Sequence, residues 1–254
     1  GPGATNLVTG IATANYDSVP LVCFTGQVAR HLIGNDAFQE VDIVGITRSI
    51  CKYGITVQRR EDLGRIIKEA FYIARTGRPG PVLIDIPKDV TANKCEYEKA
   101  EICTEKVLTN EIEESEIDSA IEMMKKSKKP FIFVGGGAVL SGASEALIEF
   151  AHKMDAPVTD SLMGKGAFPG TDDLYTGMIG MHGTKVANFG IHQADVVVVI
   201  GARFSDRVAG NAKKFAPKAK IVHIDVDPAE INKNVVADTS IIGDVREVLS
   251  LLNA

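Results

Sequence analysis

The sequence predicts an α/β protein whose parallel sheets are covered by helices on both faces. Short, unbroken apolar runs, of which residues 196–200 are the clearest, suit strands that are buried on both sides. Segments with apolar residues at helical spacing separate these runs, and most runs end in glycine, serine or aspartate. This alternation is typical of βαβ units, in which ligands bind beyond the carboxyl ends of the strands.

Length and composition limit the classes of protein to consider. The chain has 254 residues, of which 45% are hydrophobic and 24% charged, as in a globular protein of one or two domains. A net charge of −5 without a basic tract argues against nucleic-acid binding. No apolar run approaches the roughly 20 residues of a membrane span and no leader is visible, so we expect a cytoplasmic protein. The chain begins inside what looks like a motif, which predicts a piece of a longer polypeptide.

No metal site is predicted in this chain. The four cysteines, at positions 23, 51, 95 and 103, are widely spaced and form no Cys-x-x-Cys pair. Neither zinc nor a disulfide framework is therefore expected, which fits a reducing compartment. Asp225 and Asp227 have a spacing that would suit a metal, but their place after a strand favours ribose binding.

The first part of the chain is predicted as strand, helix, strand. The strands lie at 20–26 and 82–86, and the helix lies at 61–76, where an apolar stripe stops at Gly77. A glycine-rich turn at 1–6 leads into a helix, and either a structural role or a site for a phosphate or a polar cofactor ring explains it. The polar stretch 28–40 fits a functional loop and an ordinary surface loop equally well.

The second part alternates more regularly. Residues 91–115 are polar and rich in Glu and Lys, which predicts a linker between two domains. After this linker, the pattern predicts alternating helices and strands, with an irregular segment between 164 and 184. Helices are expected at 114–126, 142–153, 184–192 and 244–252, and strands at 130–134, 156–159, 196–200 and 220–224.

Loops that follow these strands are expected along one edge of the second sheet, because the carboxyl ends of parallel strands share an edge. Glycines there let a backbone approach phosphates or a flat ring closely, and carboxylates can bind a ribose. The loop residues are Gly135, Gly136, Gly137, Ser161, Leu162, Met163, Gly201, Ala202, Arg203, Asp225, Asp227, Gly243 and Asp244.

The same loops predict a dinucleotide-binding domain over 116–254. Asp225 and Asp227 lie some two dozen residues after Gly201, a separation similar to that of the ribose-binding acid in dinucleotide folds. The glycines do not form Gly-x-Gly-x-x-Gly, so NAD binding of the usual type is disfavoured. The charged residues at 203–207 fit either a ligand site or a polar loop after a core strand. His182 and His223 are the candidate acids or bases, and each also fits a packed polar residue near a cofactor.

An ordered series of motifs covers nearly the whole chain and resembles the acetohydroxyacid synthase (acetolactate synthase) large-subunit family. The motifs are GPGATN at 1–6, DAFQE at 36–40, GRPGPV at 77–82, SLMG at 161–164, GMHG at 180–183, RFSDR at 203–207 and HIDVDP at 223–228. The family depends on thiamine diphosphate and condenses two 2-keto acids with loss of CO2 in branched-chain amino-acid synthesis.

The resemblance implies a domain organisation. Residues 1–92 would be the later part of a pyrimidine-binding domain, 93–115 a linker, and 116–254 a six-stranded, Rossmann-like central domain that binds FAD. The third domain, with its Mg²⁺ site, and the glutamate that activates the aminopyrimidine ring would lie outside this chain. This segment alone is therefore expected to be inactive.

The resemblance also implies residue roles. Pro2, Asn6 and Gln39 would lie by thiamine diphosphate at a subunit interface, Phe38 would line the substrate region, and Arg207 would bind the carboxylate of the second keto acid. FAD would contact Arg78, Met181, His182 and the loop residues after the strands named above, Gly135 to Asp244. Implied partners are 2-keto acids such as pyruvate or 2-ketobutyrate, a homodimer or homotetramer, and a regulatory small subunit.

The sequence departs from the family pattern at three positions, and two other functions stay open. Ala29 and His31 stand where many members have proline and arginine, which concerns a loop near the substrate channel. Ser205 replaces an aspartate and puts one flavin contact in doubt.

The alternative functions are another thiamine-diphosphate carboligase or decarboxylase, such as glyoxylate carboligase, and a module that only binds a flavin nucleotide.

Overall fold

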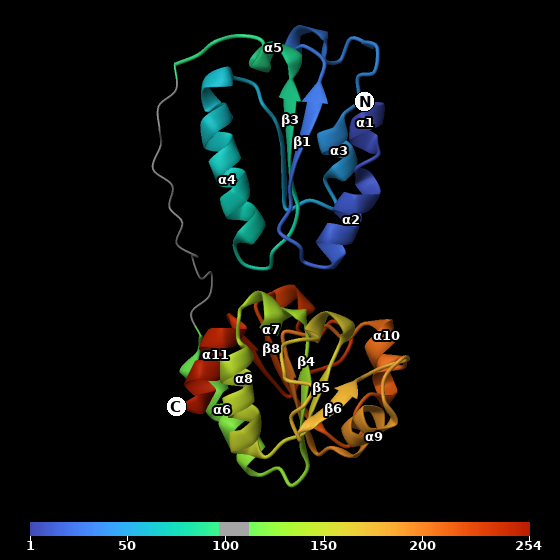
Figure 1. The fold of residues 1–254 in the computed structure, drawn as a ribbon, viewed down its shortest axis with the longest axis vertical. Helices are drawn as coiled ribbons and strands as arrows, with labels where there is room; N and C mark the ends of the chain where they lie inside the picture. Colours follow the sequence, from blue (N-terminus) through green and yellow to red (C-terminus); the bar gives the residue numbers. More distant parts are fainter. Residues whose placement is uncertain (97–111) are drawn as a thin grey trace. The chain divides into compact units, whose positions relative to one another are not determined.

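The computed structural model describes residues 1–96 and 112–254, which form two compact units (Figure 1). Most of the predicted linker, 93–115, lies outside the described residues, as does Cys103. Each unit is a parallel sheet with helices on both faces, so the predicted fold class is confirmed at this level. No helix in the described ranges is long and apolar enough to cross a membrane.

The first unit, residues 1–96, is built on a three-stranded parallel sheet. Its elements are α1 (Pro2–Thr5), α2 (Val8–Tyr16), β1 (Val22–Gln27), a 3-10 turn (Arg30–Leu32), α3 (Ile43–Thr47), β2 (Tyr53–Thr56), a second 3-10 turn (Arg60–Asp62), α4 (Leu63–Arg75), β3 (Val82–Pro87) and α5 (Lys88–Thr91). The strand order is β1-β3-β2, with Val22 opposite Val82.

Alternating side chains of β3 explain why this sheet has helices on both faces. Val82 and Ile84 pack with Ile66 and Ala70 of α4, whereas Leu83, on the opposite face, packs with α2 and α3. In Figure 1, α4 lies on one side of β1 and β3, and α1, α2 and α3 lie on the other. The central strand therefore has no face left for water, as its unbroken apolar run predicts.

The second unit, residues 112–254, contains a six-stranded parallel sheet. Its elements are α6 (Glu114–Lys125), β4 (Pro130–Val134), α7 (Gly136–Leu140), α8 (Ser144–Met154), β5 (Val158–Asp160), a 3-10 turn (Leu162–Gly164), β6 (Tyr175–Met178), α9 (Lys185–Gln193), β7 (Val196–Ile200), α10 (Asp206–Ala209), a 3-10 turn (Ala212–Lys214), β8 (Lys220–Asp225), a 3-10 turn (Pro228–Glu230), β9 (Thr239–Ile242) and α11 (Val245–Asn253).

The strand order of this sheet is β6-β5-β4-β7-β8-β9. Numbered along the unit, this is 3-2-1-4-5-6, the doubly wound order, in which the chain changes direction between strands one and four. The switch falls between β4 and β7, where Pro130 pairs with Val196. Ligands of doubly wound sheets bind beyond the strand ends at this switch.

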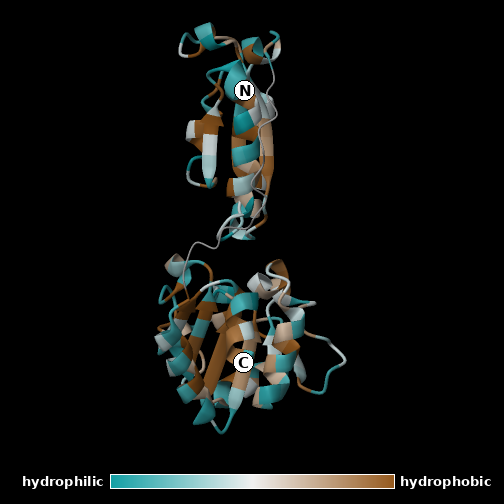
Figure 2. Cartoon of the chain, turned by 90° about the vertical axis from the view of Figure 1, so that its left-hand side faces the viewer, coloured by the Kyte–Doolittle hydropathy of each residue, from teal (hydrophilic) through white to brown (hydrophobic). Residues whose placement is uncertain are grey.

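Two cores cover the two faces of the sheet. One contains α6, α8 and α11 packed on Ile132, Val198 and Val222, and the other contains α9 packed on Phe131, Val197 and Ile221. Figure 2 accordingly colours the strands as the most hydrophobic part of this unit.

At the amino ends of the strands, away from the switch-point loops, Asp195 links the segments that precede β4 and β7. Its carboxylate accepts hydrogen bonds from Ser127 Oγ and from the amides of Lys128 (2.8 Å) and Lys129 (3.0 Å). Burial would raise the pKa of Asp195, but these hydrogen bonds outweigh it, and the pKa lies below its ordinary value.

The structure differs from the sequence prediction in four places. The opening turn at 1–6 is itself helical, as α1. The stretch taken as irregular contains the edge strand β6, whose register slips beside β5. The glycines at 135–137 were expected in a loop, but Gly136 is the first residue of the helix α7 and Gly135 is its N-cap. The short elements α3, β2, α5, α10 and β9 have no sequence prediction, since four or five residues carry too little periodicity.

Candidate functional site

The structure gathers the predicted loops of the second unit at the carboxyl edge of its sheet. They follow β4, β5, β7, β8 and β9, which are all parallel. The residues brought to this edge are Gly135, Gly136, Gly137, Ser161, Leu162, Met163, Gly201, Ala202, Arg203, Asp225, Asp227, Gly243 and Asp244. The edge spans the β4/β7 switch point, the place where ligands of doubly wound sheets bind.

The glycines at the switch point let two loops touch backbone to backbone. The amide of Gly135 donates to Ile200 O and that of Gly137 to Gly201 O, both at 2.9 Å. A Cβ at Gly135 would lie 2.3 Å from Gly201 O, and one at Gly137 would lie 2.7 Å from Gly201 Cα. Gly201 itself has φ +55°, a conformation that favours glycine. These glycines serve close packing as well as any approach of a ligand.

The three aspartates of the edge organise their own turns. Asp225 Oδ1 accepts from the amide of Asp227 (2.9 Å), and Asp227 Oδ1 accepts from the amide of Ala229 (3.0 Å). Asp244 accepts from the amide of Arg246 (3.1 Å) as the N-cap of α11. The carboxylates are thereby held at fixed positions.

The ribose analogy drawn for Asp225 and Asp227 differs from the observed topology. In the doubly wound order, the ribose-binding acid ends the second strand, and Asp225 ends the fifth, β8. The acid at the end of the second strand, β5, is Asp160. That carboxylate is only 2% exposed, and its Oδ2 already accepts a hydrogen bond from Tyr175.

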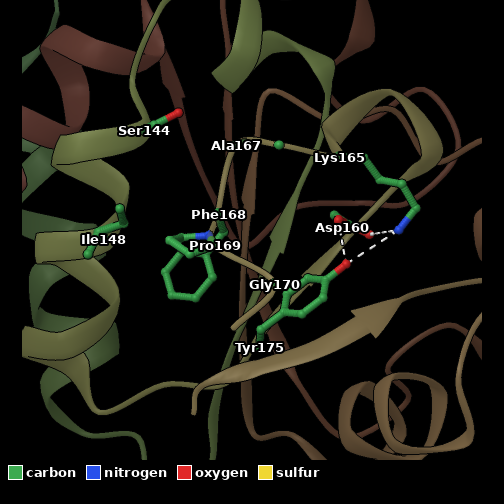
Figure 3. A pocket seen from close by; sticks show the side chains of 10 residues that line it. Ser144, Ile148, Asp160, Lys165, Ala167, Phe168, Pro169, Gly170 and Tyr175 are labelled. Carbon is green, nitrogen blue, oxygen red and sulfur yellow. Dashed lines mark hydrogen bonds and ion pairs between the residues drawn. The ribbon is translucent and has the colours of Figure 1, made fainter. Parts of the chain in front are cut away.

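Asp160 belongs to a polar cluster at the rim of a cavity of about 420 Å³ (Figure 3). Its Oδ2 accepts from Tyr175 Oη at 2.8 Å, and Lys165 Nζ lies 3.6 Å from its Oδ1. Burial, together with the bond to Asp160, raises the pKa of Tyr175. The bond to Tyr175 Oη and the nearby carboxylate raise the pKa of Lys165. Sequence analysis missed this cluster, although Asp160 directly follows a predicted strand.

Apolar side chains lie exposed at the same edge of the sheet. Ser161 caps the 3-10 turn Leu162–Gly164 by accepting from the amide of Gly164, and this leaves Leu162 70% exposed with Met163 half exposed. Met181 is also exposed, on the loop after β6. Three exposed apolar side chains at one edge of a sheet suit contact with an apolar surface of a ligand.

Arg207 lies beside the loop that carries Met181 and His182. The backbone carbonyl of Arg207 accepts from the amide of Met181 (2.9 Å). The guanidinium Nη1 of Arg207 lies 3.6 Å from Met181 Sδ. Gly180, at φ +99°, permits this contact, since a Cβ there would lie 2.3 Å from Arg207 O. The guanidinium and His182 are both exposed to solvent.

His223 is a packed core residue, the structural alternative of the sequence analysis. It is fully buried in β8, packs edge-on against Phe204, and its Nε2 lies 3.1 Å from the carbonyl of Ala202. Burial lowers the pKa of His223 more than that carbonyl and Glu230 raise it. The ring is therefore neutral at pH 7, and it holds the peptide that carries Ala202 and Arg203.

In the first unit, the structure brings the backbone of Gly1 close to that of Gln39. A Cβ on Gly1, next to Pro2, would lie 2.3 Å from Gln39 O, so α1 begins against the loop 34–41. Asn6 caps the end of α1 through its backbone amide. Phe38, in that loop, is 88% exposed and Gln39 has φ +60°. Figure 1 shows α1 near the carboxyl ends of β1 and β3.

Arg78 lies in the first unit, before β3, and its Nε donates to Ser18 Oγ at 2.9 Å. The other predicted flavin contacts belong to the second unit. Among residues 1–96 and 112–254, no group of three or more His, Cys, Asp or Glu is placed to hold a metal ion.

Comparison with known proteins gives two family matches. Residues 117–252 match the model "Thiamine pyrophosphate enzyme, central domain", and residues 1–46 match "Thiamine pyrophosphate enzyme, N-terminal TPP binding domain". The two matches lie on the two units described above.

Individual relatives extend the likeness along the whole chain. It is 49% identical to an acetolactate synthase large subunit of Haemophilus influenzae, over 98% of this chain and 44% of the relative. It is 50% identical to a probable acetolactate synthase large subunit of Methanocaldococcus jannaschii, over 98% of this chain and 43% of the relative. Escherichia coli acetolactate synthase isozyme 3 large subunit is 47% identical, over 98% and 44%. The chain thus spans less than half the length of these relatives.

Proposed function

The chain belongs to the thiamine pyrophosphate enzyme family, and from this premise we propose that it forms part of an acetolactate synthase large subunit. The whole enzyme condenses pyruvate with a second 2-keto acid, pyruvate or 2-ketobutyrate, with loss of CO2. The observation that carries the proposal is identity of 47–50% to acetolactate synthase large subunits over 98% of the chain. We assign 1–92 to the pyrimidine-binding domain, 93–115 to a linker and 116–254 to the central domain.

Thiamine diphosphate, when bound, supplies the chemistry that breaks and forms the carbon–carbon bonds. On this chain, the groups for it are Pro2, Asn6 and Gln39. Support for this grouping is local, since Gly1, which precedes α1, lies close to the carbonyl of Gln39. The role of these residues is to bind and orient the cofactor, and that of the exposed Phe38 is to shield the substrate from water. The Mg²⁺ site belongs to the part of the enzyme beyond this chain.

FAD is the second cofactor of the proposal, and the edge of the six-stranded sheet fits it. The doubly wound strand order favours a dinucleotide at the switch point, and exposed Leu162, Met163 and Met181 offer an apolar surface for a flat ring. The anchored carboxylates of Asp225 and Asp227 offer acceptors for hydroxyl groups. Flavin binding serves structure in this proposal, since the net reaction transfers no electrons.

Titration of the 254-residue chain with FAD tests this part. We expect quenching of flavin fluorescence with a saturable dissociation constant, and weaker binding in Asp225→Asn. Arg246→Lys, at an exposed position in α11, is the matched control and leaves binding unchanged. A chain that folds normally yet does not bind FAD contradicts the flavin assignment.

Arg207 is proposed to bind the carboxylate of the second keto acid. Its planar fork suits a carboxylate, and its side chain is exposed, with only a distant contact of 3.9 Å to Asp206 as an ion pair among the described residues. In the full-length enzyme, Arg207→Lys should raise KM for the second keto acid about tenfold or more, since a bidentate charged bond is lost. CO2 release from the first pyruvate continues. Unchanged product formation contradicts the role.

Product analysis of the full-length protein separates the proposal from the other carboligases. Acetolactate from pyruvate alone supports it, and a product formed only from a different 2-keto acid refutes it. Self-association into a homodimer or homotetramer, a regulatory small subunit and a cytoplasmic location are further proposals, which native mass spectrometry and cell fractionation test.

A further inference from the structure

Asp85 is a carboxylate buried inside the three-stranded sheet. It lies in the central strand β3, directly after three fully buried apolar residues, and is 1% exposed. Oδ1 accepts from Thr25 Oγ1 (2.8 Å) of β1, and Oδ2 accepts from Gln27 Nε2 (3.0 Å) of β1 and Thr56 Oγ1 (3.4 Å) of β2. A charge in such a place is costly unless its hydrogen bonds are made, so its partners are tightly determined.

Gln27 links this carboxylate to the loop beyond the sheet. Its Nε2 donates to Asp85 Oδ2 and also to the carbonyl of Val41, at 2.7 Å, while its Oε1 accepts from the amide of Val28 at 2.9 Å. Both Nε2 hydrogens thus have an acceptor. Turning the amide over would set Oε1 against two oxygens, so Asp85 fixes the orientation in which Gln27 holds Val41.

Val41 ends the loop 34–41, which we call the Gln39 loop. Glu40 closes this loop on itself, because its carboxylate accepts from the amides of Gly34 (2.5 Å) and Ala37 (3.2 Å). Gln39, at φ +60°, occupies the left-handed region that disfavours side chains, and such residues persist only where neighbouring contacts fix them. The Gln27–Val41 bond ties the end of this strained loop to the sheet.

We propose that Asp85 and Gln27 are positioning residues that hold the Gln39 loop in place for the cofactor. The inference rests on the proposed function, in which Gln39 lies by thiamine diphosphate. Asp85 acts through Gln27, and neither touches the cofactor. At position 85 a carboxylate accepts with both oxygens, from Thr25 on one and from Gln27 on the other. An aliphatic side chain there would leave Gln27 Nε2 without this acceptor.

Hydrogen exchange of the 254-residue chain tests the positioning step without any cofactor. In Asp85→Leu and in Gln27→Met, amides of residues 36–41 should exchange about tenfold faster, the effect of losing one hydrogen bond to a charged network. Thr25→Val is the matched control, since it removes a bond to Asp85 and lowers thermal stability but leaves Gln27 in place. Its loop should exchange within twofold of the parent. Equal acceleration in all three variants, or none, overturns the proposal.

A double variant separates loop positioning from plain stability. In Gln27→Glu with Asp85→Asn, donor and acceptor are exchanged, so the bond between positions 27 and 85 returns and the melting temperature recovers relative to Gln27→Glu, in which two carboxylates face each other. The new carboxylate at 27 has no hydrogen for Val41, so the loop should still exchange rapidly. A double variant whose loop exchanges as slowly as the parent overturns the role of the Val41 bond.

Cofactor affinity of the full-length enzyme tests the link to function. Gln27→Met should raise the dissociation constant for thiamine diphosphate about tenfold, while Thr25→Val should leave it within twofold. If the loop exchanges faster in Gln27→Met but affinity stays unchanged, the positioning of the loop stands and the placement of Gln39 at the cofactor is overturned. If affinity falls without faster exchange, the positioning proposal is overturned and the placement of Gln39 survives.

Discussion

Replacing Gly135 with alanine tests whether the two central loops of the six-stranded sheet need a glycine for space alone. Gly135 has φ −116°, which alanine adopts without strain, so backbone preference plays no part. The added Cβ would lie 2.3 Å from Gly201 O, 2.5 Å from Ala202 Cα and 2.6 Å from Ala202 Cβ. Two of these atoms are backbone, which no side-chain rotation can move away.

The magnitude follows from the shift required. An ordinary contact needs about 3.4 Å, so the loops must separate by about 1 Å, and overpacking of this kind costs about 1–3 kcal/mol. The same shift weakens the bonds from the amides of Gly135 and Gly137, each 2.9 Å long, at about 1 kcal/mol apiece. We expect a loss of about 3–5 kcal/mol and a fall in melting temperature of about 6–20 °C.

Urea and thermal unfolding, followed by circular dichroism, measure this loss in the 254-residue chain. Gly170→Ala is the matched control in the same unit, because a Cβ there meets only the ring of Tyr175, at 3.7 Å. Its stability should change by less than about 0.5 kcal/mol. If Gly135→Ala has the same urea midpoint and melting temperature as the parent protein, the close approach of the two loops does not limit the residue at this position and the reasoning fails.

Four further predictions use other parts of the fold. Asp195→Asn should cost about 2 kcal/mol at pH 7; because the pKa of Asp195 is lowered in the folded chain, the difference should shrink as the pH falls below the ordinary pKa of an aspartate and disappear below the folded pKa, as urea unfolding over a series of acid pH values checks. Tyr175→Phe should cost about 1–3 kcal/mol by leaving Asp160 one hydrogen bond short, and ultraviolet titration of the parent should show one tyrosine that ionises above the ordinary range, absent from the variant. Stability should fall as pH drops below about 6.5, because the unfolded state protonates His223 more readily, and His223→Gln should remove that part of the pH dependence. Gly10→Ala should stabilise the chain by about 0.5–1 kcal/mol, since the exposed position in α2 has open space; an unchanged or lower melting temperature contradicts it.

The elements α4 and β7 could be predicted because their burial leaves a clear mark, a periodic apolar stripe in the helix and an unbroken apolar run in the strand. The stripe in residues 61–76 corresponds to α4, Leu63–Arg75, and the run 196–200 corresponds to β7. Both pack on neighbours that dictate which faces are apolar. The half-buried edge strand β6 gave no such signal, because its residues Tyr175–Met178 include a glycine at φ +89° and face two environments.

The candidate site was predictable as a place and less so in its details. Loops after parallel strands share an edge whatever their chemistry, so grouping Gly135 with Gly201 needs only the strand pattern. The role of those glycines in packing depends on which strands are neighbours, and the order of strands is absent from a linear pattern. For the same reason, the ribose analogy chose Asp225, although the acid at the topologically matching position is Asp160.

Buried polar networks were the least predictable feature. Asp85 sits in an apolar run, where a lone carboxylate signals a partner without telling which one. Its partners Thr25, Gln27 and Thr56 lie 60, 58 and 29 positions away. Only the assembled sheet brings them together.

The strand order of the second unit also bears on how it folds. Along the sheet, Ile132 pairs with Val158 and Val196 pairs with Lys220, across 26 and 24 positions, whereas Pro130 pairs with Val196 across 66. Closing the longer loop costs the most chain entropy and delays folding. The β4/β7 junction is thus a seam between two halves that each have more local contacts. A ligand bound across the loops at this seam would act as a staple, and it would stabilise the unit at the joint that is hardest to close.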